Sequence, residues 1–327
     1  MTYGILKSGA LAAALFSFGT AAQAECGDLV VTEMNWASSQ VVTSVAKFIL
    51  ETGYGCSIEM VPSSTVPALA SVAETGKPDI VSELWINGAP SYEELEAKGT
   101  IKTLTDVLSD GGDEGWWVPQ YIVDEHPEAG TLEGILANPE LVGNRFHQCP
   151  EGWGCQRANA SKSQAFGLVD AGVEIFQHGS GETLATSIAS AYANKEPWFG
   201  YYWAPTAILG KYPMVKIDLG EYVPEVHACD SDPECAERGQ RKSSYPVSPV
   251  KTIVTTAFID ASPDAAEFMS KLSFTNAQMN GLLAWKDANE ATAEETAVQF
   301  LTTSQDIWST WISDDAKGKL SFLLNDS

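Results

Sequence analysis

The tryptophans are the first feature of this sequence that could do chemistry. The chain holds ten tryptophans in 327 residues. Four of them, Trp36, Trp85, Trp153 and Trp203, stand at predicted strand ends or in turns. Binding residues concentrate at such positions in open α/β sheets. Core packing is the alternative for any single tryptophan, but four at loop positions favour a shared ligand cage.

An aromatic cage suits the binding of a quaternary ammonium. Such a cation spreads its charge over methyl groups and carries no N–H donor, so ordinary hydrogen bonds cannot hold it. An indole face attracts it through the ring quadrupole and contributes about 0.5–2 kcal/mol when desolvated. Trp308 and Trp311, by contrast, stand three residues apart and indicate the buried face of a helix.

The cysteines indicate disulfides rather than a metal site. An even number of six on an exported chain favours oxidation, and several connectivities are open. Pairing of nearest neighbours is the simplest, and it gives Cys26–Cys56, Cys149–Cys155 and Cys229–Cys235. A zinc site is the alternative, but the sequence has no CxxC and its four histidines are scattered. We therefore expect no metal.

Catalytic motifs are not evident. The sequence has no G-x-S-x-G and no H-E-x-x-H. Ser180, in His178-Gly-Ser-Gly181, resembles a nucleophile turn but better fits the start of the helix that follows. Oxidised cysteines would also leave no thiol nucleophile. An exported hydrolase remains the alternative class, but we expect a binding protein with neither enzymatic activity nor a cofactor.

Residues 1–24 have the features of a secretory signal peptide. Lys7 precedes an apolar run from Ala10 to Phe18, and small residues end at Ala24. The run is too short to cross a hydrocarbon core of about 30 Å. We expect a soluble, exported protein that begins near Glu25. Its formal charge of −24 repels nucleic acid and anionic lipid, which excludes both as partners.

The segments that carry the tryptophans alternate between strand and helix patterns. Strand-type runs at 28–33, 57–61 and 79–85 are separated by helical patterns at 41–50 and 66–73. We expect Gly53 to end the first helix. Strand, helix, strand, helix, strand is typical of a parallel sheet wrapped by helices.

The alternation resumes after residue 117. The pattern predicts strands at 121–123 and 250–258, helices at 165–176, 182–193, 264–272 and 294–312, and an apolar segment at 198–203. About 300 residues exceed what one core usually organises, so we expect an α/β chain with two lobes. The sequence has no low-complexity linker, and we therefore expect strands to cross between the lobes.

Four longer motifs extend over most of the chain. They are Cys149-Pro-Glu-Gly-Trp-Gly-Cys155, Glu196-Pro-Trp-Phe-Gly-Tyr-Tyr-Trp203-Ala-Pro, the segment 79–90, and Tyr245-Pro-Val-Ser followed by a strand and Pro263-Asp-Ala-Ala. Together they resemble the periplasmic glycine betaine/proline betaine binding proteins of enteric bacteria. The resemblance implies a two-lobed α/β periplasmic binding protein of type II, with parallel-rich mixed sheets, two crossing hinge strands and the ligand in the interlobe cleft.

The resemblance also implies site residues. The three family cage tryptophans carry over to Trp85, Trp153 and Trp203, and we expect Trp36 to add a fourth wall. The backbone amides of Gly154 and Cys155 would hold the carboxylate of the ligand. A disulfide-closed loop can fix N–H groups in an anion-binding concavity, although a purely structural staple is the alternative.

The polar end of the ligand decides its identity. Glycine betaine and dimethylsulfoniopropionate offer a carboxylate to N–H donors. Trimethylamine N-oxide, if protonated, would favour a carboxylate such as Glu133, Glu83 or Glu33, and choline is a further alternative. We expect an osmolyte of the glycine betaine or trimethylamine N-oxide type.

Lobe boundaries and partners complete the prediction. We expect residues 25–117 with 252–327 in the first lobe and residues 118–251 in the second, with crossings near Val118–Val123 and Tyr245–Thr252. The family resemblance implies a periplasmic protein, a membrane permease and an ATPase as partners. We expect a monomer.

Overall fold

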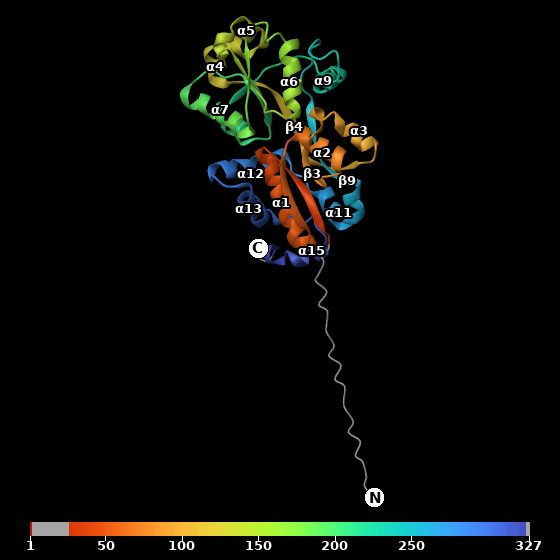
Figure 1. Cartoon of the computed structure of the whole chain (residues 1–327). Coiled ribbons are helices and arrows are strands. Elements are labelled where there is room, and N and C mark those ends of the chain that lie inside the picture. Colours follow the sequence, from red (N-terminus) through yellow and green to blue (C-terminus); the bar gives the residue numbers. More distant parts are fainter. Residues whose placement is uncertain (2–25, 325–327) are drawn as a thin grey trace.

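The computed structural model describes Met1 and residues 26–324, so the predicted signal peptide lies outside the described residues apart from Met1. Figure 1 shows two lobes, with β4 at their junction. From residue 26 the chain forms β1 (Asp28–Met34), α1 (Ala37–Tyr54), β2 (Ser57–Ser63), α2 (Thr65–Thr75), β3 (Ile80–Trp85), the short 3-10 helix η1 (Ile86–Gly88), α3 (Ser91–Ala97) and β4 (Ile101–Pro119).

The middle of the chain builds the second lobe. Its elements are α4 (Gln120–Glu125), η2 (Pro127–Gly130), α5 (Leu132–Ala137), η3 (Pro139–Val142), β5 (Arg145–Gln148), α6 (Gly154–Ala165), β6 (Glu174–Gln177), α7 (Gly181–Asn194), β7 (Gly200–Ala204), α8 (Ala207–Lys211), β8 (Met214–Lys216) and α9 (Pro224–Ser231).

The last part of the chain returns to the first lobe (Figure 1). Its elements are β9 (Val247–Thr255), α10 (Thr256–Ala261), α11 (Pro263–Lys271), α12 (Asn276–Ala288), α13 (Ala293–Thr303), α14 (Gln305–Trp308), α15 (Asp314–Lys319) and α16 (Ser321–Leu324).

Within residues 26–324 nine strands form one connected network, in the order β2-β1-β3-β9-β4-β7-β5-β6, with β8 on β4. The pairs β1–β2, β1–β3, β5–β6 and β5–β7 are parallel. The pairs of β9 with β3 and β4, and of β4 with β7 and β8, are antiparallel. This confirms the predicted α/β class with mixed, parallel-rich sheets.

Strand β4 links the two lobes. It pairs with β9 from Ile101 to Asp113 and then with β7 from Asp113 to Trp117. One long strand therefore serves both sheets and fixes where their edges meet. The predicted residue limits of the lobes stay a prediction.

Two apolar clusters fill the lobes. One packs the face of α1 that carries Val42, Val45 and Ile49 against α11, α12 and α13. The other extends from the second lobe into the first and includes Trp36, Trp153 and Trp203, so the predicted cage residues lie in the apolar region that both lobes share.

The helix at the N-terminus forms as its pattern predicts, but Gly53 does not end it. Gly53 is buried inside α1, where a Cβ would lie 3.2 Å from Leu320 and 3.3 Å from Ala316, closer than most Cβ contacts. Gly55 takes the C-cap position instead, with a left-handed φ of 69° that glycine tolerates best.

Four other predicted elements are corrected. Residues 121–123 lie in helix α4, because β4 ends at Pro119, which has no N–H to continue a ladder. Residues 165–176 are not a helix, since Gly167 and Gly172 adopt left-handed φ angles of 81° and 80° and turn the chain into β6. The helix predicted at 294–312 is interrupted at Ser304, and the strand predicted at 250–258 ends at Thr255.

The three predicted disulfides are confirmed. Cα–Cα distances are 4.8 Å for Cys26–Cys56, 6.3 Å for Cys149–Cys155 and 5.4 Å for Cys229–Cys235. The second bond closes the loop between β5 and α6, and the third ends the acidic turn that follows α9.

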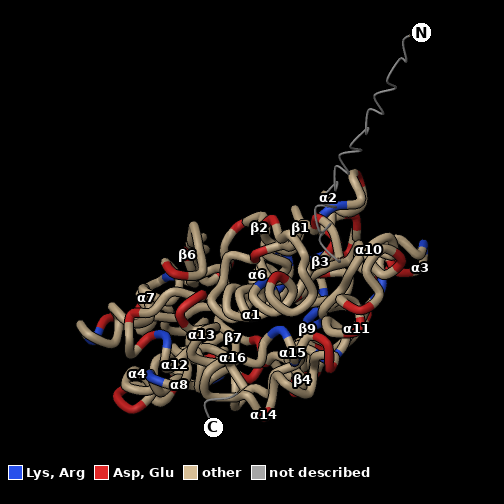
Figure 2. Tube along the Cα trace, turned by 90° about the horizontal axis from the view of Figure 1, so that it is seen from below, with Lys and Arg blue, Asp and Glu red and all other residues tan. Residues whose placement is uncertain are grey.

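Acidic residues are spread along the outer helices and loops, with fewer basic ones among them, as Figure 2 shows. This distribution fits the negative charge of the sequence. None of the helices in the described part of the chain is both long and apolar enough to span a membrane.

Candidate functional site

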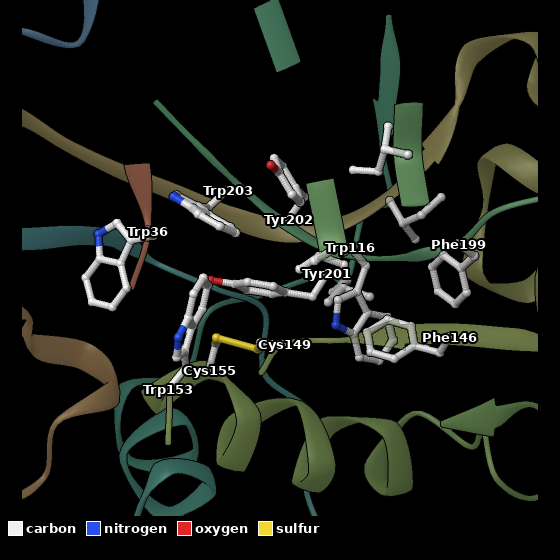
Figure 3. Close-up of a cluster of buried hydrophobic side chains, with 14 of the residues drawn as sticks. Trp36, Trp116, Phe146, Cys149, Trp153, Cys155, Phe199, Tyr201, Tyr202 and Trp203 are labelled. Atoms are coloured by element: carbon white, nitrogen blue, oxygen red, sulfur yellow. A yellow bond between two sulfur atoms is a disulfide. The ribbon is translucent and has the colours of Figure 1, made fainter. Parts of the chain in front are cut away.

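Four tryptophans meet in one small cavity between the lobes. Trp85 ends β3, Trp36 precedes α1, Trp203 lies near the end of β7, and Trp153 precedes α6. The rings of Trp36 and Trp153 meet edge to face with centroids 5.1 Å apart, and those of Trp153 and Trp203 at 5.0 Å. Figure 3 shows Trp36, Trp153 and Trp203 close together, with the Cys149–Cys155 bond next to Trp153.

The free space in the cavity is only about 30 Å³, well below the range for ligand pockets, so its walls lie close together in this structure and would have to separate to admit a ligand. Its lining consists of Trp36, Thr65, Trp85, Glu114, Trp153, Gly154, Cys155, Tyr201 and Trp203. Six of the predicted site residues therefore line one cavity. A larger cleft of about 310 Å³ adjoins it and shares Trp36 and Trp203, but it lacks Trp85 and Trp153 and lies between α7 and α12.

Glu83 orients two of the four indoles. It lies on β3 and is fully buried, and one of its oxygens, Oε1, accepts hydrogen bonds from Trp36 Nε1 at 2.7 Å and Trp85 Nε1 at 3.0 Å. The hydroxyl of Ser38 donates to the same oxygen at 2.9 Å. Burial raises the pKa of Glu83, while these three donors lower it in part. This carboxyl therefore fixes the ring planes from behind the cage.

The ring of Trp85 has space only because the residue it packs against is a glycine, Gly112. A Cβ on Gly112 of β4 would lie 2.0 Å from Cζ3 of the Trp85 ring, so the indole packs directly on the backbone of the linking strand. The side chain of Trp85 is held by a carboxyl at its nitrogen and by backbone at its six-membered ring.

Trp153 reaches across from the second lobe to the first. Its Nε1 donates to Asn35 Oδ1 at 2.6 Å, and only 5% of the residue is exposed. The disulfide Cys149–Cys155 closes the loop that carries it. A ring held at its nitrogen and at its backbone has little freedom to leave the cavity.

Backbone donors accompany this ring. Gly154 and Cys155 are the first residues of α6, and no side chain caps this helix. The first N–H groups of any α-helix have no intrahelical partner and lie at the positive end of the helix dipole. Both residues line the cavity, so their N–H groups are suited to an anionic or strongly polar ligand atom.

Glu114 is the acid within the cavity lining. It lies on β4 and is 7% exposed. Tyr201 donates to its Oε1 at 2.7 Å, and the Ser248 hydroxyl donates to Oε2. Burial raises the pKa of this carboxyl, and the two hydroxyl donors partly offset the effect. The cavity therefore combines aromatic faces with a buried carboxyl.

The other two predicted acids do not reach the cavity. Glu133 is exposed in the first turn of α5, on the outside of the second lobe. Glu33 is half-buried on β1, where burial and the nearby charge of Glu294 raise its pKa. Of the three proposed carboxylates, only Glu83 contacts the cage.

Sequence reasoning missed four residues of the site and its support. These are Asn35, Thr65, Glu114 and Tyr201. Glu114 carried a usable signal, since it precedes the apolar run Gly115-Trp-Trp-Val118 inside a strand, where an acid is unexpected. The others had no signal beyond their neighbours.

The fold and the cavity define the class of two-lobed ligand-binding proteins. Residues 27–303 match the family described as the substrate binding domain of the ABC-type glycine betaine transport system. This match extends over most of the chain, and the chain therefore belongs to that family. The resemblance read from the motifs is confirmed, and so is the predicted role as substrate-binding component of an ABC importer.

Solved structures agree with the fold. A glycine betaine/L-proline-binding protein (ProX) from Borrelia burgdorferi has a TM-score of 0.69 at 18% identity, over 89% of this chain and 99% of that one. An ABC-transporter choline binding protein in complex with choline has a TM-score of 0.73 at 16% identity, over 91% and 98%. Lactococcal OpuAC in its closed form with glycine betaine has a TM-score of 0.67 at 18% identity, over 88% and 100%. These likenesses concern the fold, and the ligand must be argued from this site.

Proposed function

We propose that this chain captures a small methylated-ammonium osmolyte, of the glycine betaine or trimethylamine N-oxide type, in the cage of Trp36, Trp85, Trp153 and Trp203. The convergence of four indoles on one cavity is the observation that carries the proposal. Each face contributes about 0.5–2 kcal/mol to a desolvated cation, so four together supply several kcal/mol. Methyl groups also fill an apolar cavity without leaving an N–H donor unpaired.

The rim of the cavity offers N–H donors that suit an oxygen atom at the other end of the ligand. The N–H groups of Gly154 and Cys155 would bind a carboxylate or an N-oxide oxygen at the start of α6. The disulfide holds these donors in place before the ligand arrives, which lowers the entropy cost of binding.

Glu114 favours a second candidate ligand. A buried carboxyl beside the cage attracts the cationic head, but it disfavours a ligand carboxylate placed close to it. Choline has no anionic end and could donate its hydroxyl to Glu114. Glycine betaine and dimethylsulfoniopropionate would have to keep their carboxylates on the side of the Gly154 and Cys155 amides.

Several wider features belong to the same proposal. The lobes, with residues 25–117 and 252–327 in one and 118–251 in the other, would close on the ligand because both contribute cage walls. The closed monomer would deliver its ligand in the periplasm to a membrane permease driven by an ATPase. The protein would bind without catalysis, and the pairing of all six cysteines in disulfides supports this.

The test is titration calorimetry of the processed chain with glycine betaine, trimethylamine N-oxide, choline and dimethylsulfoniopropionate. Glycine is the matched control, because it keeps the carboxylate of glycine betaine and lacks the methyl groups. We expect at least one methylated ligand to bind with a Kd in the micromolar range or below, and glycine not to bind at millimolar concentration. Absence of binding by all four compounds at millimolar concentration would overturn the proposal.

The variant Glu114→Gln separates the ligand types. It removes the negative charge and keeps the shape of the side chain. We expect weaker binding of choline and trimethylamine N-oxide, by about tenfold or more, and unchanged or tighter binding of the two carboxylate ligands. An equal loss for all four ligands would show that Glu114 serves only the cationic head.

A further inference from the structure

The disulfide loop of the second lobe contacts the first lobe through its backbone. The N–H of Val66, in the first turn of α2, donates to the carbonyl of Gly152 at 3.1 Å. On the other side of Trp153, Gly154 lies against Gly88 at the end of η1. The indole of Trp153 thus enters the first lobe between two points where the backbones of the lobes touch.

The contact between Gly88 and Gly154 has no space for a side chain. A Cβ on Gly88 would lie 2.7 Å from the Cα of Gly154, and a Cβ on Gly154 would lie 2.3 Å from the carbonyl oxygen of Gly88. Ordinary contacts of a Cβ begin near 3.4 Å. The obstructing atoms are backbone atoms, which cannot rotate away as a flexible side chain can.

Neither glycine is required by its own backbone conformation. Gly88 and Gly154 are not among the glycines with positive φ, so alanine could adopt both conformations. The three nearest neighbours of a Cβ at Gly154 all belong to Gly88, and those at Gly88 belong to Gly154 and Cys155. Each position therefore requires glycine because backbone of the opposite lobe lies where a side chain would be.

We infer that Gly88 and Gly154 are positioning residues that set how closely the lobes approach when the cage closes. The inference rests on the proposed function, because it assumes that closure serves ligand binding. A methyl group at either position would hold the lobes about 1 Å further apart at this contact. The Gly154 and Cys155 amides lie at the same contact, so that displacement would move them away from Trp36 and Trp85.

The test compares Gly88→Ala and Gly154→Ala with Gly281→Ala. Gly281 is a matched control because it lies in helix α12, where an added Cβ would meet no other atom within 4 Å. Calorimetry with glycine betaine, trimethylamine N-oxide and choline should show a Kd at least tenfold higher for the two contact variants and an unchanged Kd for Gly281→Ala. The double variant should lose less than the sum of the two single losses, because both methyl groups force the same separation.

A second readout needs no ligand. The Val66 amide bonds to Gly152 only while the lobes touch, so its hydrogen exchange reports the contact directly. We expect faster exchange at Val66 in Gly88→Ala than in the parent chain, at an unchanged melting temperature. If Val66 exchange and ligand affinity both match those of Gly281→Ala, the inference is overturned. If the parent chain binds none of the ligands, the proposed function fails while the exchange rates still decide whether the glycines set the approach.

Discussion

Replacing Trp153 by alanine should weaken ligand binding more than the loss of one cage wall alone would. The ring faces the cavity, donates to Asn35 at 2.6 Å and meets the edge of Trp36 at 5.1 Å. Asn35 and Trp36 belong to the first lobe and Trp153 to the second. These contacts form when the lobes meet, so their loss counts in the binding free energy.

The magnitude follows from three contributions. One cation–π face contributes about 0.5–2 kcal/mol. The edge-to-face pair contributes about 0.5–1.5 kcal/mol, and the hydrogen bond to Asn35 about 0.5–1.5 kcal/mol. Since neighbouring contributions are not additive, we expect a loss of about 2–4 kcal/mol for Trp153→Ala, or about 30- to 1000-fold in Kd.

Calorimetry and thermal melting of Trp153→Ala and a control variant test whether Trp153 walls the cage. Trp311→Ala is the control, because Trp311 is buried between the rings of Phe274 at 5.4 Å and Phe300 at 5.7 Å, away from the cavity. It should lower the melting temperature and leave Kd unchanged. Retention of full affinity by Trp153→Ala for every methylated ligand would refute the cage, and the loop would then be only a structural staple.

Three further predictions follow from the structure. Glu83→Gln should keep an oxygen that can accept from both indoles but lose the charge, so Kd should rise about tenfold in calorimetry while the fold persists; unchanged affinity would contradict a role of the Glu83 charge in binding. Burial lowers the pKa of both His147 and His227 to about 3, with further lowering by His178 and Arg145 at the first and by Lys162 at the second. In the unfolded chain these histidines bind protons near pH 6.5, so the free energy of unfolding should be highest above that pH and should fall as the pH drops towards 3. Urea titrations should show a fall of up to about 1.4 kcal/mol per pH unit for each histidine, and a flat profile would contradict this. The exposed ion pair Lys211–Asp287, at 2.8 Å, joins α8 to α12 across the lobes, so Lys211→Met should change Kd by less than about fivefold, and the change should disappear in high salt.

The sequence was sufficient for most of the fold because local patterns and covalent links specify it. Strand β1, helix α1 and strand β3 follow directly from their apolar periods, and the tryptophans at their ends lie beside one another as expected. The nearest-neighbour disulfides are also local. The predictions for residues 121–123 and 165–176 were wrong where turn chemistry, at Pro119 and at Gly167 and Gly172, overrode an apolar run.

The supporting acids could not be predicted from local sequence. Besides its neighbour Trp85, Glu83 binds Trp36, 47 positions away, and Glu114 binds Tyr201, 87 positions away. Such pairs depend on the sheet order β1-β3-β9-β4-β7, which no local pattern encodes. Glu133 was selected by its closeness in sequence to ligand-bearing segments, but the surface of α5 faces away from the cavity.

Under the proposed function, the two buried acids would give a physical reason for a methylated-ammonium ligand to favour the closed form. Glu83 lies behind the cage and Glu114 in its lining, and burial raises the pKa of each. Both carboxyls accept hydrogen bonds that favour the ionised state, so closing an empty cavity over them carries an electrostatic cost. A methylated ammonium between the indoles supplies the missing positive charge without needing a hydrogen bond of its own. The ligand then gains affinity from the same charges that oppose closure in its absence, and this difference between the two states is what ligand-driven closure requires.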